Sequence, residues 1–398
     1  MRQRFSADGE KLQSWKVIAA FFGREVRTVQ LWEKHEGLPI HRHLHSKQGR
    51  VFAYRTELET WRRGATLIPE RRAFPPSFIS SDGAAADAYG LARFLWGQRT
   101  MSSLRRAETQ FRRAIDLDPK FSAAYAGLAD CMVSYSVLRL MTPREAADAA
   151  NLALQALLAL PERTDMDSLN GVANVMVCCN WNWSGGERYS SEACQRNPQD
   201  SRALQIRSAY MSARRRHPDA IRYAVGAVRL DPYSKALNLE AGFAHYFAGD
   251  YDAAMPYASR MIEIDPDFAA GHALLGRIES ERGNWEIAAR ALQEAAGLAG
   301  NAIAYRALLA YAFAKGGDRT LGRRALAGVD VFEASLACPV AMAAAQAQLG
   351  ETDSALRLLA TAREQRDSEL ITLASDPRFA ALRRRSGFRE VIHSLGLN

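Results

Sequence analysis

Apolar residues recur at helical spacing through most of the chain beyond residue 86, in segments that end near proline or glycine. Pro198, Pro232 and Pro266 follow one another at intervals of 34 residues, and Gly300 occupies the next equivalent position. A fixed period of this length is typical of stacked helix pairs, in which each unit buries its apolar face against its neighbours. The pattern predicts a mainly α-helical chain, with a solenoid of about eight repeats over residues 87–375 and a capping helix over residues 376–398.

The repeat at 235–268 and the one after it carry small and aromatic residues at equivalent positions. These positions hold Gly242 and Gly276, Gly249 and Gly283, Tyr251 and Trp285, and Ala254 and Ala288. In this respect the two repeats resemble the tetratricopeptide repeat (TPR) family. The resemblance implies an α-solenoid that winds into a superhelix with a concave inner face.

The resemblance also indicates which side chains of each first helix face that inner groove. These residues are Phe243, Tyr246, Phe247, Arg277 and Tyr311. An exposed apolar groove normally binds a partner, here a protein or peptide with apolar anchors and a carboxylate for Arg277. The alternative is that neighbouring repeats or the linker cover these side chains, which would then serve packing alone.

A different pattern precedes the repeats, with two short amphipathic segments on either side of Gly23. Glycine permits the tight turn between two helices that this pattern predicts. Ser14 is a candidate N-cap for the first helix. The apolar stripe of that helix consists of Val17, Ile18, Phe21 and Phe22.

The second amphipathic segment presents an apolar side and a polar side. Val26 and Val29 face inward, together with Trp32 or Leu31. The polar side can enter the major groove of DNA, where arginine pairs with guanine and glutamine with adenine. After Gly37 and Pro39, two short extended arms around a polar turn predict a β-wing, followed by a helix from Thr56.

The wing carries basic residues and three alternate histidines, His41, His43 and His45. This composition suits contacts with phosphates or with the edge of a minor groove. Alternate histidines on one face of a strand can also bind a metal ion, although neither a cysteine nor an acidic residue stands beside them. Incidental surface histidines are the third interpretation, and we expect no metal or other cofactor.

Residues 14–63 resemble the winged helix-turn-helix domains of the excisionase/MerR type. The resemblance rests on the run from Gly23 to Glu33, G-x-x-x-R-T-V-Q-x-W-E, and on the wing-to-helix run "RVFAYRTELETW". It implies that the second helix reads double-stranded DNA and that the wing meets the DNA backbone. The candidate DNA-binding residues are Arg24, Arg27, Thr28, Gln30, Lys34, Arg42, His43, Lys47 and Arg50.

The distribution of charge agrees with a DNA-binding N-terminal domain. Residues 1–75 hold 15 Lys and Arg against 8 Asp and Glu, so they carry +7 of the formal net charge of +8. A basic segment on an otherwise neutral chain is typical of a nucleic-acid-binding module. We therefore assign residues 1–63 to this domain and residues 64–86, which are rich in Pro, Ser, Gly and Ala, to a linker.

The remaining composition excludes several classes of protein. No stretch is apolar enough for a membrane span, and the N-terminus lacks the apolar segment of a secretory signal, so we expect a cytoplasmic protein. The five cysteines show no C-x-x-C spacing and are expected to be buried apolar residues. No P-loop, G-x-G-x-x-G, H-E-x-x-H or G-x-S-x-G motif occurs, so we do not expect an enzyme.

These features together predict a transcriptional regulator. Its N-terminal domain binds DNA, and its solenoid binds a partner protein or peptide or itself oligomerises, for example as a homodimer. The alternative is a TPR interaction scaffold whose helix-turn-helix binds protein. A scaffold has no reason to keep Arg27, Lys34, Arg42, Lys47 and Arg50 together.

Overall fold

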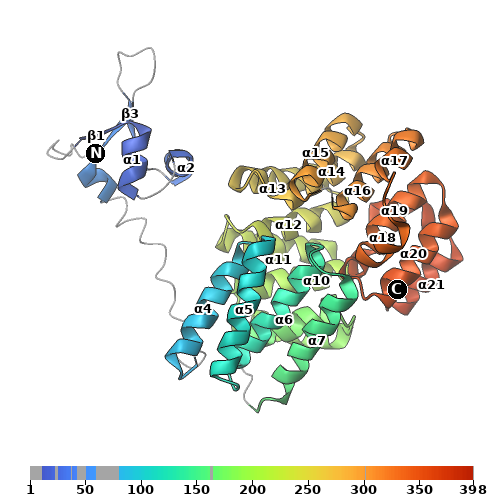
Figure 1. The fold of residues 1–398 in the computed structure, drawn as a ribbon, viewed down its shortest axis with the longest axis horizontal. Helices are drawn as coiled ribbons and strands as arrows, with labels where there is room; N and C mark the ends of the chain where they lie inside the picture. Colours follow the sequence, from blue (N-terminus) through green and yellow to red (C-terminus); the bar gives the residue numbers. More distant parts are fainter. Residues whose placement is uncertain are drawn as a thin grey trace. The chain divides into compact units, whose positions relative to one another are not determined.

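The computed structural model describes residues 11–22, 26–36, 38–42, 51–59, 80–161, 165–300 and 302–397. The chain divides into two compact units, Met1–Ile79 and Ser80–Asn398 (Figure 1). Among the helices in these described ranges, none is long and apolar enough to cross a bilayer.

The first unit combines two helices with a small antiparallel sheet. The helices are α1 (Trp15–Phe22) and α2 (Val26–Glu36), and the strands are β1 (Lys11–Gln13), β2 (His41–Arg42) and β3 (Val51–Tyr54). The strand order is β1-β3-β2, with Leu12 opposite Ala53 and His41 opposite Phe52. The chain becomes helical again directly after β3, at residues 55–59.

The core of this unit lies between α1, α2 and the sheet. Ile18, Val29, Ala53 and Leu58 are fully buried there. Val17 was expected in the apolar stripe of α1, but its side chain is 43% exposed. The reason is that Ile18 and its neighbour Ala19 point into the core, and Val17 lies about 100° from Ile18 and about 200° from Ala19 around the helix axis, on the opposite side.

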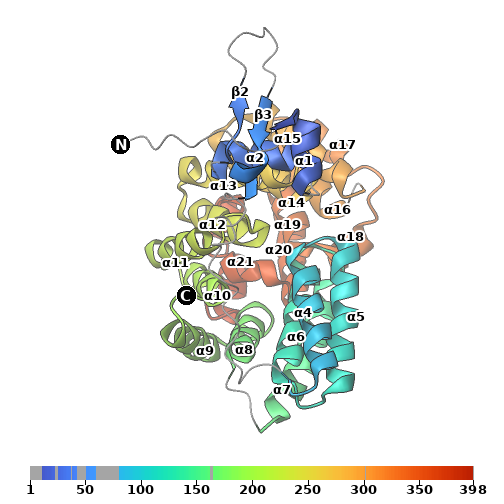
Figure 2. The same cartoon turned by 90° about the vertical axis from the view of Figure 1, so that its left-hand side faces the viewer.

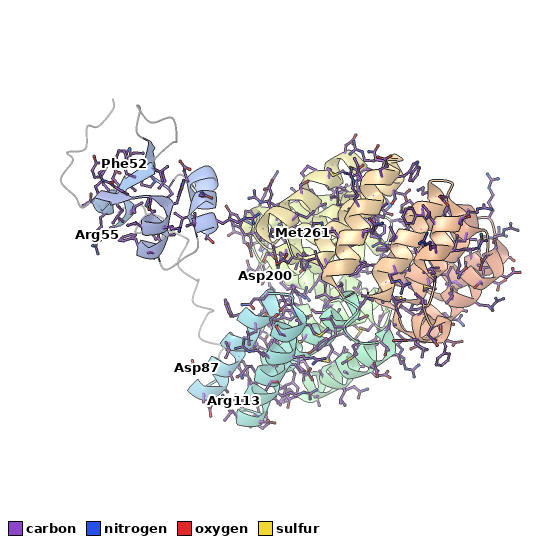
Figure 3. The ribbon with its side chains drawn as sticks, turned by 45° about the horizontal axis from the view of Figure 1, so that its top comes forward. Phe52, Arg55, Asp87, Arg113, Asp200 and Met261 are labelled. Atoms are coloured by element: carbon purple, nitrogen blue, oxygen red, sulfur yellow. The ribbon has the colours of Figure 1, made fainter. Side chains whose placement is uncertain are left out.

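Local interactions fix the start of α1 and the end of β3. Ser14 caps α1, because its Oγ accepts a hydrogen bond from the Val17 amide at 3.5 Å. Phe52 lies within β3, and Arg55 starts the helical turn that follows the strand (Figure 3). The Arg55 guanidinium lies 5.5 Å from the ring of Phe21, so it covers one edge of the apolar core.

In its described part, the second unit consists of helix pairs, each made of two consecutive helices in contact. The pairs are α4 (Gly83–Gly97) with α5 (Met101–Leu117), α6 (Ser122–Val137) with α7 (Pro143–Ala159), α8 (Met166–Cys178) with α9 (Trp183–Arg196), α10 (Ser201–Ala213) with α11 (His217–Leu230), α12 (Lys235–Ala248) with α13 (Tyr251–Ile264), α14 (Ala269–Arg282) with α15 (Trp285–Leu298), α16 (Ile303–Lys315) with α17 (Arg319–Ala325), and α19 (Pro339–Leu349) with α20 (Thr352–Glu364). A short helix, α18 (Val331–Ala337), precedes the last pair.

The central pairs repeat with a strict period. The first helices α10, α12, α14 and α16 begin at Ser201, Lys235, Ala269 and Ile303, each 34 residues after the previous one. Each pair therefore presents the same faces to its neighbours, and the buried contacts continue along the array, for example at Met261 of α13 (Figure 3).

Glycines let the helices of a pair and of neighbouring pairs approach closely. A Cβ at Gly242 would lie 2.4 Å from Leu274 Cδ2 on the next first helix, and a Cβ at Gly276 would lie 2.4 Å from Leu292 Cγ. Both distances are far below van der Waals contact, so the leucine side chains occupy the space that these glycines leave open.

The array begins earlier than the sequence predicted. Helix α4 starts at Gly83, inside the predicted linker 64–86, and Asp82 caps it by accepting from the amides of Ala84 and Ala85. The alanine-rich run was assigned to the linker because it lacks apolar periodicity. Alanine, however, has the highest helix propensity, and a preceding Asp N-cap is a helix start signal.

The C-terminal residues do more than cap the last pair. Two 3-10 helices, η2 (Ser368–Thr372) and η3 (Pro377–Leu382), follow α20 and precede α21 (Ser386–Ser394). We call residues 367–382 the return segment, because η2 contacts the first helices α6, α8 and α10 from the opposite end of the array. Figure 1 shows the array curving from α4 over α14 and back to α21.

Further contacts close this curve. Trp183 Nε1 at the start of α9 donates to the carbonyl of Leu395 at 2.7 Å, and Arg214 Nη1 donates to the carbonyl of Gly396 at 2.7 Å. Figure 2 shows the superhelix turned by 90°. The expected capping helix is thus part of a longer segment that contacts the second, third and fourth helix pairs, α6 to α11.

Candidate binding site on the inner face of the array

A cavity of about 250 Å³ lies on the inner face of the second unit. Its wall comes from the first helices α6, α8, α10, α12, α14, α16 and α19, and the return segment lines it as well. The polar and charged side chains in this wall include Arg99, Ser134, Arg139, Asn174, Arg202, Gln205, Ser212, Glu240, Arg277, Ser368, Glu369, Thr372 and Arg378. A concave site of this kind, with convergent charged groups on an otherwise apolar wall, is typical of ligand binding.

Three of the five predicted groove residues line this cavity: Phe243, Phe247 and Arg277. Phe243 and Phe247 are one helical turn apart on α12, and their rings stack with centroids 5.6 Å apart. The guanidinium of Arg277, on α14, lies 5.2 Å from the Phe243 ring. The inner face therefore offers two aromatic rings beside a cation.

Tyr246 and Tyr311 were expected to be exposed in the groove, and this expectation is wrong. Tyr246 is 0% exposed and packs with Met261 and Leu274, because its position on α12 turns it toward the neighbouring helices. Tyr311 is 2% exposed and shares a buried cluster with Phe379 of the return segment. Its position in the repeat does face inward, but the chain's own C-terminal residues cover it.

The return segment is held by buried ion pairs with the inner face. Arg139, just after α6, donates from Nη1 to Asp367 Oδ2 at 3.0 Å, and its Nη2 lies 3.0 Å from Glu369 Oε1. Asp367 is fully buried, and the Arg139 side chain is 10% exposed. Ser136 of α6 adds a hydrogen bond to Ser368, with 3.3 Å between the hydroxyl oxygens.

The second half of the return segment has its own ion pair. Arg378 donates from Nε and Nη2 to Asp376 Oδ2 at 2.9 and 2.6 Å, and its Nη2 also donates to Glu369 Oε2 at 3.1 Å. Arg277 approaches the same carboxylates, with Nη2 3.9 Å from Asp376 Oδ2 and 4.0 Å from Glu369 Oε2. Glu369 therefore lies within 4.0 Å of three arginines: Arg277 of α14, Arg139 just after α6, and Arg378 of η3.

The titration of these groups reflects the balance between burial and charge. Burial opposes ionisation of Glu369, but the charges of Arg139, Arg378 and Arg277 outweigh it and hold its pKa well below the usual range. For Asp367 the burial dominates, so its pKa is raised despite the nearby Arg139. The paired charges are stable only while both partners remain in place.

Sequence reasoning missed Arg139, Asp367, Glu369, Asp376 and Arg378. Asp376 and Arg378 belong to a run that was assigned to the terminal cap. A local signal was present, because Asp367 and Asp376 each accept a hydrogen bond from the amide two residues later and so start a 3-10 turn. Two such turns in succession predict a segment that is not one continuous capping helix.

Four of the candidate DNA-binding residues, Arg27, Thr28, Gln30 and Lys34, belong to α2 of the first unit. Arg27 and Gln30 are exposed and Thr28 is half-buried, whereas Val29 between them is fully buried. The candidates Arg24, His43, Lys47 and Arg50 lie outside the described residues, as do the side chains of Lys34 and Arg42. Among the described candidates, only Arg27 and Gln30 are exposed, and they lie on the same face of α2.

Of the three histidines in the predicted wing, the structure describes only His41. Its Nε2 lies 2.6 Å from Glu57 Oε2, and its ring stacks on Phe52 with centroids 5.2 Å apart. His43 and His45 are outside the described residues. In the part of the chain that the structure describes, no three His, Cys, Asp or Glu side chains are placed to hold a metal ion.

The stacked helix pairs define an α-solenoid of the TPR type. Residues 248–312 match a family model described as tetratricopeptide repeat. This match confirms the predicted TPR array in the region where the 34-residue period is strict. A search of curated protein sequences finds no match.

Solved structures with similar folds include several TPR proteins. Cut9–Hcn1, from a hetero-tetramer of the APC/C, has a TM-score of 0.50 at 17% identity and covers 85% of this chain and 59% of that chain. MamA from Desulfovibrio magneticus has a TM-score of 0.36 at 16% identity, covering 42% and 93%. YrrB, a TPR protein with an unusual peptide-binding site, has a TM-score of 0.28 at 19% identity, covering 47% and 89%. At this identity the likeness to Cut9–Hcn1 concerns the fold alone.

Proposed function

We propose that this protein is an interaction scaffold whose TPR array binds an acidic, partly apolar segment of a partner protein on its inner face. The observation that supports this proposal is the return segment itself. It lies on the inner face with Asp367 and Glu369 paired to Arg139, and it buries Leu370 and Leu373 completely. A partner segment with the same spacing of carboxylates and leucines would find the same groups.

We propose that the scaffold acts by binding and not by catalysis. The cavity wall includes one thiol, that of Cys178, and burial raises its pKa to about 12, so it stays protonated and poorly nucleophilic at neutral pH. The arginines and carboxylates around the return segment are engaged in ion pairs. Such an arrangement holds a segment in place and provides no activated nucleophile.

A labelled synthetic peptide of residues 365–382 tests the proposal. In the wild-type chain the tethered return segment competes with the peptide, because its effective concentration is about millimolar. The double substitution Asp367→Asn and Glu369→Gln in the full chain weakens this competitor. We expect the peptide to bind that variant at least about tenfold more tightly than the wild type.

The matched control is the same peptide with Asn and Gln at these two positions, which should bind neither chain. Circular dichroism of the variant chain checks that the helical array remains folded. If the acidic peptide binds neither chain, or binds no better than the control peptide, the inner face is not a recognition site for acidic segments.

A second candidate function is the binding of double-stranded DNA by the first unit. The observation that favours it is the exposed pair Arg27 and Gln30 on α2, next to a β1-β3-β2 sheet, in the segment that carries most of the net charge. Arginine and glutamine on one helix face suit the edges of guanine and adenine. Under this proposal the scaffold brings its partner to DNA and acts as a transcriptional regulator.

Selection of bound duplexes from a random pool by the full chain tests this candidate. The Arg27→Ala and Gln30→Ala variants should each lose about 1 to 3 kcal/mol of preference at particular base pairs, while Arg105→Ala in the array should change nothing. Affinity should also fall steeply with salt. A full chain that retains no duplex at low salt, or variants that keep the wild-type preference, would exclude sequence recognition by α2.

A further inference from the structure

The arginines in the cavity wall differ in how their charges are balanced. Four of them lie within 4.0 Å of a carboxylate: Arg139 of Asp367, Arg202 of Asp130, Arg277 of Asp376, and Arg378 of Asp376. Arg99, which follows α4, has no ion-pair partner among the described residues. Arg99 is therefore the one arginine of this wall that no carboxylate of the described residues contacts directly.

The Arg99 guanidinium is nonetheless fixed in position. Its Nη1 donates to Ser134 Oγ, and its Cζ lies 3.8 Å from the centre of the Trp96 ring. Trp96 Nε1 donates to the same Ser134 oxygen at 3.0 Å. Arg202 lies over Trp96 as well, at 5.0 Å, so a second cation lies close to the first.

This environment disfavours the charged form of Arg99. Burial lowers its pKa to about 9, and the repulsion of Arg202 adds to the effect. An anion beside the guanidinium would offset both penalties. The Nε of Arg99 is buried and makes no hydrogen bond to any described residue, so the guanidinium is incompletely hydrogen-bonded in the protein alone.

A second arginine presents donors without acceptors in the same wall. Arg277 is 6% exposed, and its Nε and Nη2 make no hydrogen bond within the described residues, since the carboxylates near Nη2 are 3.9 Å or more away. A buried donor without a partner costs about 1 to 3 kcal/mol. A bound acceptor would remove this penalty.

The rest of the wall is mainly apolar. Phe243, Phe247 and Phe268 line it together with aliphatic side chains such as Leu239 and Leu308. Successive first helices follow one another along the inner face, so the α12–α14 part of the wall supplies the aromatic rings, and the α4–α10 part supplies Arg99 and Arg202. An inorganic ion would leave the aromatic part empty, whereas a neutral apolar molecule would leave Arg99 without a counter-ion.

We propose that this cavity binds a small organic carboxylate, with Arg99 holding the anionic group and the wall around Phe243 and Phe247 holding an aromatic or aliphatic body. A monoanion matches the one arginine of this wall that lies within 4.0 Å of no described carboxylate. This ligand is distinct from the acidic partner segment, whose carboxylates pair with Arg139. The return segment forms part of the cavity wall at Ser368–Thr372, so a bound carboxylate also stabilises that segment against opening.

Calorimetric titration of the full chain with indole-3-acetate, 3-phenylpropionate and octanoate tests this inference. At least one of the three should bind about tenfold or more tightly than its neutral amide, because the amide offers no charge to Arg99. Arg99→Met, which keeps the aliphatic stem on Trp96, should weaken that carboxylate by about tenfold or more. Arg105→Met, at an exposed position outside the cavity, should leave the affinity unchanged.

Phe247→Trp provides an independent variant that keeps Arg99 intact. The larger ring fills part of the cavity and should also weaken the bound carboxylate, and hydrogen exchange of residues 368–372 should slow when the carboxylate binds. The inference is overturned if none of the three carboxylates binds, if acid and amide bind equally, or if Arg99→Met or Phe247→Trp binds as the wild type does. Failure of the labelled acidic peptide to bind, with carboxylate binding intact, would overturn only the proposed scaffold function.

Discussion

Arg139 and Asp367 are 228 residues apart in the sequence, yet Arg139 Nη1 donates to Asp367 Oδ2 at 3.0 Å in a buried environment. This ion pair joins the end of α6 to the start of the return segment and so closes the superhelix. Open solenoids contain only contacts between neighbouring repeats. The closing contact couples the stability of the α6/α7 pair to that of the C-terminal residues.

Replacing Arg139 by Met should therefore destabilise the second unit strongly. The substitution leaves Asp367 buried without its partner, and breaking a buried ion pair in this way costs about 3 to 5 kcal/mol. Urea denaturation measures the loss, and hydrogen exchange should become faster across residues 367–382. Arg112→Met is the matched control, because Arg112 is exposed and pairs with Glu108 within α5, where a pair contributes about 1 kcal/mol or less. Unchanged exchange in the return segment of Arg139→Met would contradict the closing role.

Close helix packing at Gly276 leads to a second prediction. Gly276→Ala would place its Cβ 2.4 Å from Leu292 Cγ, and Leu292 is 1% exposed and has little room to move. Overpacking of this kind costs about 1 to 3 kcal/mol. Gly90→Ala in α4 is the control, since nothing lies within 4 Å of its Cβ position, and it should stabilise the helix by about 0.5 to 1 kcal/mol. Thermal melting of both variants measures the difference in sign.

Much of the array could be predicted from the sequence because its rules are local. Pro232 and Pro266 end helices at a fixed interval, and Gly242 and Gly276 mark equivalent close contacts, so one repeat predicts the next. The return segment could not be predicted in this way. Its position depends on the curvature accumulated over all the repeats, which brings Asp367 to Arg139, and no pattern within one repeat encodes that distance.

For the candidate site, too, the sequence predicted the residues at repeat positions but not those whose place depends on the whole array. Phe243 and Arg277 are 34 residues apart and occupy equivalent positions, so the family resemblance placed both on the inner face. Tyr311 occupies the next equivalent position, but the return segment buries it. Arg99 lies between two helices rather than at a repeat position on a first helix, so its presence in the cavity wall follows only from the three-dimensional structure.

The cavity wall also predicts a pH dependence, through Glu240. Burial raises the pKa of this carboxyl to about 7, although a 2.8 Å hydrogen bond from Ser208 and the charge of Arg202 oppose the shift. The folded chain therefore holds a proton that the unfolded chain releases near pH 4.5. Stability from this group is complete below about pH 4.5 and is lost as the pH rises toward 7.

Glu240→Gln removes this dependence because glutamine does not titrate. Relative to the wild type, the variant should gain about 2 to 3 kcal/mol between pH 4.5 and pH 8, at about 1.4 kcal/mol per pKa unit. Urea denaturation at several pH values measures the gain, and Glu286→Gln at an exposed position of α15 serves as the control. A constant difference between variant and wild type across this range would show that Glu240 titrates normally.

The last prediction separates packing from ligand contact among the aromatic residues of the inner face. Tyr311 donates from its hydroxyl to Glu281 Oε1 at 2.6 Å, and Lys315 pairs with the same carboxylate. Tyr311→Phe removes one charged hydrogen bond while Lys315 still neutralises Glu281, so it should cost about 1.5 to 3 kcal/mol. Tyr311→Ser also leaves a space beside Phe379 and should cost about 3 to 5 kcal/mol.

Phe247 lines the cavity and is only half-buried, so Phe247→Ser should cost less than Tyr311→Ser. The three variants are compared by thermal melting and by titration with the carboxylate that binds the wild type. Tyr311→Phe should lower the melting temperature and keep the affinity, whereas Phe247→Ser should mainly lower the affinity. The opposite assignment, with Tyr311→Phe losing affinity at an unchanged melting temperature, would place Tyr311 in contact with the ligand rather than beneath the return segment.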